Sequence, residues 1–112
     1  MRKTLSYMGF AKKAGQLISG TDTCRIHMQK GRVKLLIVAE DTGPAAREKI
    51  LGLSARYGVP VIEYGSMEEL SRAVGTSGRT VFGITEEGFA STIREAIETE
   101  NRGEVSNEEV SG

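Results

Sequence analysis

The chain has 112 residues, with fifteen Lys or Arg, fifteen Asp or Glu and a formal net charge of zero. This length suits one domain with a single core, and it is too short for a catalytic domain joined to a regulatory one. Tryptophan is absent, so no row of aromatic side chains is offered for stacking single-stranded bases. No apolar run reaches the roughly 18 residues of a membrane span, and the first residues lack the apolar core of a signal peptide. One cysteine excludes an internal disulfide and fits a cytoplasmic protein best.

The neutral total conceals two halves of opposite charge. Residues 1–34 contain eight cations and one anion, a net charge of +7, whereas the remaining residues contain seven cations and fourteen anions, a net charge of −7. Such asymmetry predicts one end that faces a polyanion and another that is solvated or repels it. Two solvated faces without any ligand are the alternative, which charge alone does not exclude.

The first helix is expected to have Leu5, Met8 and Ala11 on its buried face and to end near Gly15. Residues 16–19 then predict a short strand. A second helix is expected to follow this strand.

The second helix is expected to begin after Gly20 and to end at Gly31. Thr21 and Asp22 can cap its N-terminus with a side-chain oxygen. Because free backbone N–H groups at such a terminus attract anions, phosphate is the first ligand to consider. A capped helix that packs on a sheet and binds nothing is the alternative.

The later elements continue the alternation of helical and strand periods. We expect a buried strand over residues 35–39, a helix over 44–58, a strand at Val61 and Ile62, a capped helix over 66–74, a strand over 81–85 and a last helix after Thr85. This order predicts an α/β fold in which helices cover both faces of a four-stranded sheet. Residues 101–112 are polar and acidic, so they predict a disordered tail after a domain of residues 1–100.

The sequence offers few groups of side chains that could perform catalysis. Cys24 and His27 have the spacing of a thiolate–imidazole pair, but we expect both on the buried side of the second helix, together with Met28. Glu40 and Asp41 are adjacent at a strand end, so their side chains diverge and do not form an acid–base pair. One His and one Cys cannot complete a zinc site. We therefore expect no enzymatic activity, no metal and no cofactor.

The order of these segments resembles the kink-turn-binding ribosomal protein superfamily. The similarity lies in the run Gly15–Gly20, the helix to Gly31 and the run Lys34–Asp41, and it continues through residues 57–61, the helix of 66–75 and the loop before Val81. Residues 85–90, together with residues 9–11, are similar to the bacterial YlxQ-type subgroup. The resemblance covers nearly all of residues 4–98.

The resemblance implies a three-layer α/β/α sandwich with a four-stranded mixed sheet that binds structured RNA without catalysis. Its RNA face is built from the N-terminus of the second helix, the end of the second strand and the loop before the last strand. The matching positions in this chain are Gly20, Thr21, Asp22, Thr23, Arg25, Ile26, Glu40, Asp41, Gly78, Arg79 and Thr80. The expected partner is structured RNA, ribosomal RNA foremost, with the ribosome or other translation proteins as further candidates and no membrane. A protein–protein adaptor on the same fold, without RNA binding, is the alternative function.

Three positions in the second helix depart from the pattern of the superfamily. Asp22 and Thr23 occupy the places of Asn and Glu, and Ile26 occupies the place of Lys. An ionised Asp only accepts hydrogen bonds, and Ile makes none. These departures predict RNA binding with weak discrimination for a standard kink-turn.

Overall fold

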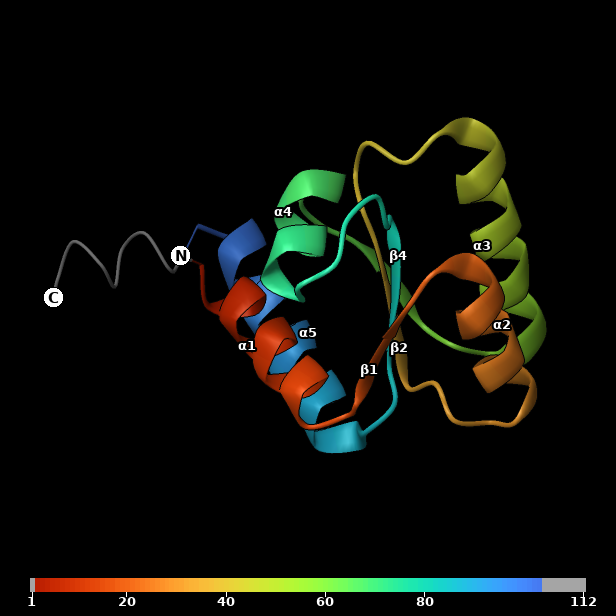
Figure 1. Cartoon of the computed structure of the whole chain (residues 1–112), viewed down its shortest axis with the longest axis horizontal. Coiled ribbons are helices and arrows are strands. Elements are labelled where there is room, and N and C mark those ends of the chain that lie inside the picture. Colours follow the sequence, from red (N-terminus) through yellow and green to blue (C-terminus); the bar gives the residue numbers. More distant parts are fainter. Residues whose placement is uncertain (1, 104–112) are drawn as a thin grey trace, which may run out of the picture.

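The computed structural model describes residues 2–103, in which nine helices and strands alternate in the order predicted from the sequence (Figure 1). The helices are α1 (Lys3–Lys13), α2 (Thr21–Gln29), α3 (Pro44–Tyr57), α4 (Met67–Ala73) and α5 (Glu87–Asn101), and the strands are β1 (Leu17–Ser19), β2 (Leu35–Val38), β3 (Val61–Glu63) and β4 (Val81–Ile84). None of the helices within residues 2–103 is long and apolar enough to cross a membrane.

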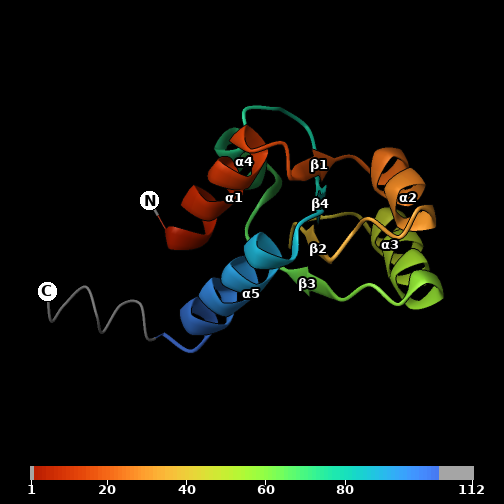
Figure 2. The same cartoon turned by 90° about the horizontal axis from the view of Figure 1, so that it is seen from below.

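The four strands form one mixed sheet in the order β1-β4-β2-β3. Strand β4 runs antiparallel to both β1 and β2, whereas β3 runs parallel to β2. Helices α1, α4 and α5 cover one face of the sheet, and α2 and α3 cover the other (Figures 1 and 2). The predicted three-layer α/β/α sandwich with a mixed sheet is confirmed.

Strand β2 lies in the middle of the molecule and serves both cores. Leu35 and Ile37 belong to the apolar cluster beneath α1, α4 and α5, whereas Leu36 and Val38 belong to the cluster beneath α2 and α3. All four side chains are buried. The unbroken apolar run that predicted a strand covered on both faces thus has a direct explanation.

Helix α2 packs closely on the sheet because β4 carries a glycine beneath it. A Cβ atom placed on Gly83 would lie 3.1 Å from Ile18 Cγ1 and 3.2 Å from Cys24 Sγ, closer than ordinary packing allows. Cys24 is fully buried at this contact, and burial raises the pKa of its thiol to about 12. The small residue in β4 therefore sets how near α2 approaches the sheet.

Side chains complete the N-termini of two helices on the other face. The predicted capping box at α4 is present, since the Ser66 hydroxyl accepts from the Glu69 N–H and the Glu69 carboxylate accepts from the Ser66 N–H, both at 3.1 Å. At α5 the Glu86 carboxylate accepts from the N–H groups of Gly88 and Phe89, both at 2.8 Å. These backbone hydrogen bonds lower the pKa of Glu86 below its ordinary value.

A largely buried carboxylate joins the end of α5 to the start of α1. Glu100 accepts hydrogen bonds from the Thr4 N–H at 3.2 Å and the Thr4 hydroxyl at 2.5 Å, and it also accepts one from the Tyr64 hydroxyl. Burial and the neighbouring Glu100 carboxylate raise the pKa of Tyr64. Helix α5 extends to Asn101, one residue into the segment predicted as a tail, and residues 104–112 of that tail lie outside the described residues.

Candidate nucleic-acid interface

Segments far apart in the sequence meet at one end of the strands, which forms one edge of the sheet. The Gly20 N–H donates to the Val81 carbonyl at 2.9 Å, and the Ala39 N–H donates to the Thr80 carbonyl at 2.8 Å. The end of β1, the end of β2 and the start of β4 therefore lie side by side. The three segments that the family resemblance named are brought together here.

The N-terminus of α2 opens onto this edge through a glycine. Gly20 is the N-cap, with φ 98° and ψ 143°, and no side chain caps the helix. Thr21 and Asp22 lie in the first turn, so the prediction that one of them caps the helix is wrong. An N-cap glycine leaves first-turn N–H groups without a side-chain acceptor, which suits an incoming anion.

The Arg79 side chain lies over that glycine. Its Nη1 atom is 3.2 Å from the position that a Cβ atom on Gly20 would take, and Thr23 Oγ1 is 4.0 Å from the same position. The positive φ favours glycine at position 20, and a Cβ atom there would push the end of the Arg79 side chain aside by a few tenths of an ångström. Arg79 forms no ion pair with any carboxylate in residues 2–103, so its charge is available to a ligand.

A buried serine holds the backbone of Arg79 in place. Ser71 of α4 is 3% exposed, and its hydroxyl accepts from the Arg79 N–H at 3.0 Å and donates to the Arg79 carbonyl at 2.9 Å. Gly78, just before it, has φ 70°, which the turn into β4 requires. Sequence reasoning missed Ser71, since a serine within an amphipathic helix gives no sign of what it will contact.

The remaining residues predicted on α2 lie at the surface. Ile26 is 43% exposed and Thr23 is also exposed, as expected for a face turned away from the core. Asp22 lies 3.9 Å from both the Arg25 guanidinium and the Lys49 ammonium group. Pairs this exposed are weak, so a phosphate can compete for the two cations.

The two carboxylates after β2 diverge, as predicted. Asp41 accepts a hydrogen bond from the Met67 N–H at 2.9 Å and so holds the start of α4. The Glu40 side chain is exposed, while its backbone carbonyl accepts from Arg47 Nη2 at 2.9 Å. Asp41 therefore has a structural partner, and Glu40 keeps a free acceptor at the edge.

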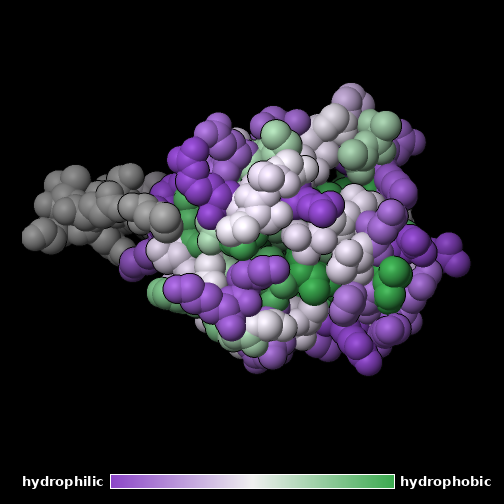
Figure 3. Space-filling view, in the orientation of Figure 1, coloured by the Kyte–Doolittle hydropathy of each residue, from purple (hydrophilic) through white to green (hydrophobic). Residues whose placement is uncertain are grey.

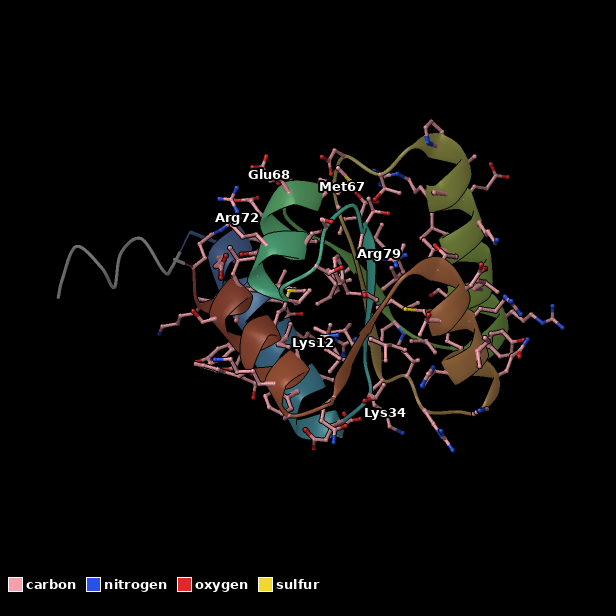
Figure 4. All side chains as sticks on the ribbon, viewed as in Figure 1. Lys12, Lys34, Met67, Glu68, Arg72 and Arg79 are labelled. Atoms are coloured by element: carbon pink, nitrogen blue, oxygen red, sulfur yellow. The ribbon has the colours of Figure 1, made fainter. Side chains whose placement is uncertain are left out.

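The charge asymmetry suggests that the cations of residues 1–34 lie together, but they do not gather at this edge. Arg25 alone lies on α2, while Lys30 and Lys34 follow the helix at the other end of the sheet, where the Lys34 N–H donates to the Ile84 carbonyl. Figure 4 shows Lys34 near the opposite end of the strands from Arg79. The early cations are spread along the strands because α2 carries the chain from one end of the strands to the other, so the polyanion-facing end stays a prediction.

No catalytic or metal-binding arrangement was identified within residues 2–103. His27 is partly exposed, so the prediction that it faces the core with Cys24 is wrong, and its Nδ1 atom lies 3.0 Å from the Thr23 carbonyl oxygen. Cys24 is buried with a raised pKa, which leaves it unreactive. No group of three or more His, Cys, Asp or Glu in this part of the chain could hold a metal ion.

Comparison with known proteins identifies the family. The model of the ribosomal protein L7Ae/L30e/S12e/Gadd45 family matches residues 2–94. The chain is 33% identical over 97 residues to the RNA-binding protein YlxQ of Enterococcus faecium, covering 87% of this chain and 93% of the relative. It is 29% identical over 86 residues to the RNA-binding protein YlxQ of Bacillus subtilis (strain 168), covering 77% of this chain and 86% of the relative. Both relatives are named as RNA-binding proteins and not as enzymes.

Solved structures share the fold. A protein of unknown function from Bacillus halodurans C is 33% identical, with a TM-score of 0.83 over 88% of this chain and 99% of the other. The Giardia lamblia 15.5kD RNA binding protein, at 20% identity, superimposes with a TM-score of 0.70 over 85% of this chain and 82% of the other. This protein is therefore a YlxQ-type member of the ribosomal protein L7Ae/L30e/S12e/Gadd45 family.

Proposed function

We propose that the protein binds structured RNA, without catalysis, through the edge of the sheet at which α2 begins. The observation that carries this proposal is the position of Arg79 over Gly20, which joins a free guanidinium to the open N-terminus of a helix. Both groups favour a phosphate: the N–H groups as donors, and the guanidinium as a charged, planar donor. The names of the two YlxQ relatives support the same ligand class.

Base recognition would come from the groups beside this phosphate site. Thr23, Glu40 and Thr80 offer hydroxyl and carboxylate groups at or near the same edge. Recognition of folded RNA depends on shape and on unpaired base edges, so a row of stacking aromatics is not required. Ribosomal RNA in the cytoplasm is the proposed target, and the protein would act as a ribosomal component or as a ribosome-associated factor.

The test is a double substitution, Arg25→Ala with Arg79→Ala, compared with Arg56→Ala with Arg94→Ala. Both pairs remove two cations that are at least partly exposed, but the second pair lies on α3 and α5, away from the proposed face. RNA affinity measured across a salt series should fall for the first pair, with a flatter slope by about 0.7–0.9 per lost phosphate contact. Equal effects of the two pairs would falsify the proposed face. If the wild-type protein bound no RNA, the proposal of RNA binding itself would be wrong.

The identity of the RNA has its own test. Crosslinking of the protein to RNA in cells, followed by sequencing of the bound fragments, should return ribosomal RNA segments. Fragments drawn evenly from abundant cellular RNAs would argue against a ribosomal target while leaving RNA binding in place.

A further inference from the structure

Helices α1 and α4 form a groove on the side of the sheet opposite α2. The groove encloses about 400 Å³. Its floor is apolar and includes Leu5, Gly9, Ala73 and Val74. Gly9 allows the two helices to come close, because a Cβ atom there would lie 3.1 Å from the Ala73 carbonyl oxygen.

An exposed aromatic side chain lines this groove. Phe10 is 55% exposed, more than Ile26, Leu51 or Met67, which are the other exposed large hydrophobic residues of the described chain. A single exposed apolar residue is ordinary, but one beside an apolar groove extends that groove into a larger apolar surface. Figure 3 shows hydrophobic surface between hydrophilic groups over α1 and α4.

The rim of the groove is positively charged. Lys12, Lys13 and Arg72 line it, and no carboxylate does. Lys12 and Lys13 form no ion pair with any residue in the range 2–103, whereas Arg72 has only the exposed Glu68, at 2.7 Å. Figure 4 shows Lys12 on α1 and Arg72 on α4, the two helices that bound the groove. Two of the three rim cations, Lys12 and Lys13, therefore lack a partner of opposite sign within the described residues.

We propose that this α1/α4 groove docks an acidic, amphipathic helix of a partner protein. Apolar side chains at i, i+3 or i+4, and i+7 of such a helix would fill the floor and cover Phe10, and flanking carboxylates would meet Lys12, Lys13 and Arg72. Ser6 is the only uncharged polar side chain that lines the groove, so base edges would find few hydrogen-bond partners there. The lining thus favours a peptide over single-stranded RNA.

The groove and the proposed RNA face have no lining residue in common, although the loop from Gly75 of the groove leads to Arg79 of the RNA face. The groove is built from α1 and α4, whereas the RNA face begins at α2 on the other side of the sheet. A protein partner and an RNA could occupy the molecule together. The docking proposal therefore does not depend on the proposed RNA function, and it would make the protein a bridge between the two.

The first experiment places the photo-crosslinking residue p-benzoylphenylalanine at position 10, with the same residue at position 51 as control. Leu51 is 44% exposed on α3, outside the groove, so both substitutions should leave the fold intact, which circular dichroism checks. Crosslinking in cells of the source organism should yield a protein adduct at position 10 whose sequenced segment is acidic and amphipathic. The adduct should be lost in the variant with Lys12→Glu and Lys13→Glu.

Several results would overturn the proposal. They are an adduct to RNA, an adduct to a second copy of this chain, a basic or non-amphipathic segment, an adduct that survives the charge reversal, and no adduct above the level of position 51. A positive result is then quantified with the synthetic peptide of the crosslinked segment, followed by amide chemical shifts of Gly9, Phe10, Ala73 and Gly75. The charge reversal should weaken that peptide's affinity by roughly tenfold or more.

Discussion

The Ser71 hydroxyl forms hydrogen bonds with both the N–H and the carbonyl of Arg79, at 3.0 and 2.9 Å. A buried side chain of α4 thereby positions the loop that presents the guanidinium to the start of α2. The substitution Ser71→Ala should lower the free energy of unfolding by about 1–3 kcal/mol, because two backbone groups lose their partner. It should also weaken RNA binding.

Urea unfolding and an RNA titration measure these two effects. Ser91→Ala is the matched control, since Ser91 is exposed on α5. If Ser71→Ala destabilised the protein while RNA affinity stayed the same, Ser71 would be a structural residue only, and Arg79 would need no positioning.

The packing of α2 on the sheet depends on the missing side chain at Gly83. The substitution Gly83→Ala would push against Ile18 and Cys24, and such overpacking costs about 1–3 kcal/mol. Gly52→Ala on α3 is the opposite case, because a Cβ atom there meets nothing within 4 Å and Ala favours the helix by about 0.5–1 kcal/mol. Thermal melts should therefore shift in opposite directions, and a stabilising Gly83→Ala would show that α2 can move outward at no cost.

Low pH should reduce the free energy of unfolding, partly through the Glu86 cap of α5. Because hydrogen bonds from Gly88 and Phe89 lower the folded pKa of Glu86, the carboxylate contributes stability above the ordinary Glu pKa of about 4.3. That contribution is lost as the pH falls through the lower folded pKa. The variant Glu86→Gln keeps an acceptor oxygen but not the charge, so its urea midpoint should vary less with pH in this acid range.

The control for this experiment is Glu87→Gln, which removes the same charge one residue later. Some acid dependence will remain in Glu86→Gln, because the pKa of Glu69 is lowered as well, chiefly by its hydrogen bond with the Ser66 backbone. An unchanged pH profile in Glu86→Gln would mean that the cap carries no charge-dependent stability.

The C-terminal limit of the domain can be tested with two truncations. Deletion of residues 104–112, which belong to the tail predicted to be disordered, should leave the melting temperature almost unchanged and RNA affinity equal or slightly higher. Deletion from residue 100 onward removes the carboxylate that bonds Thr4 and Tyr64, which should cost about 1.5–3 kcal/mol for each charged hydrogen bond lost. A large loss of stability in the shorter deletion would show that the tail docks on the domain.

RNA specificity is expected to follow three residues at the start of α2. The combined change Asp22→Asn, Thr23→Glu and Ile26→Lys restores the polar and charged groups that the superfamily pattern has there. It should improve kink-turn binding, at about 1–3 kcal/mol for each good base contact. The comparison is a kink-turn RNA against a straight duplex of equal length, at fixed salt, for both proteins. A wild-type preference for the kink-turn of about a thousandfold would contradict this interpretation of Asp22 and Ile26.

The elements of the fold could be predicted from the sequence because local rules decide them. The apolar run of β2 and the capping box of α4 depend on neighbours in the chain, and both appear as expected. The N-cap of α2 was predicted wrongly because Gly20, Thr21 and Asp22 are all residues that can cap a helix. The backbone of Gly20, with φ 98°, and the nearby Arg79 side chain from the other half of the chain both favour glycine at the cap.

The site was predicted less completely because it depends on contacts between distant segments. Nothing near Ser71 in the sequence indicates its hydrogen bonds with Arg79. The resemblance places Asp41 on the RNA face, but gives no sign that its carboxylate holds the start of α4. His27 stands next to Met28 in the sequence, but it turns about 100° around the helix from that residue and reaches solvent.

The contact between Thr4 and Glu100 brings the start of α1 and the end of α5 together, and α2 lies at the far side of the molecule (Figure 1). An anchor attached next to Thr4 or next to Glu100 would therefore turn the same side of the domain toward a sensor surface. In that orientation Arg79 and the N-terminus of α2 stay accessible to RNA in the flow.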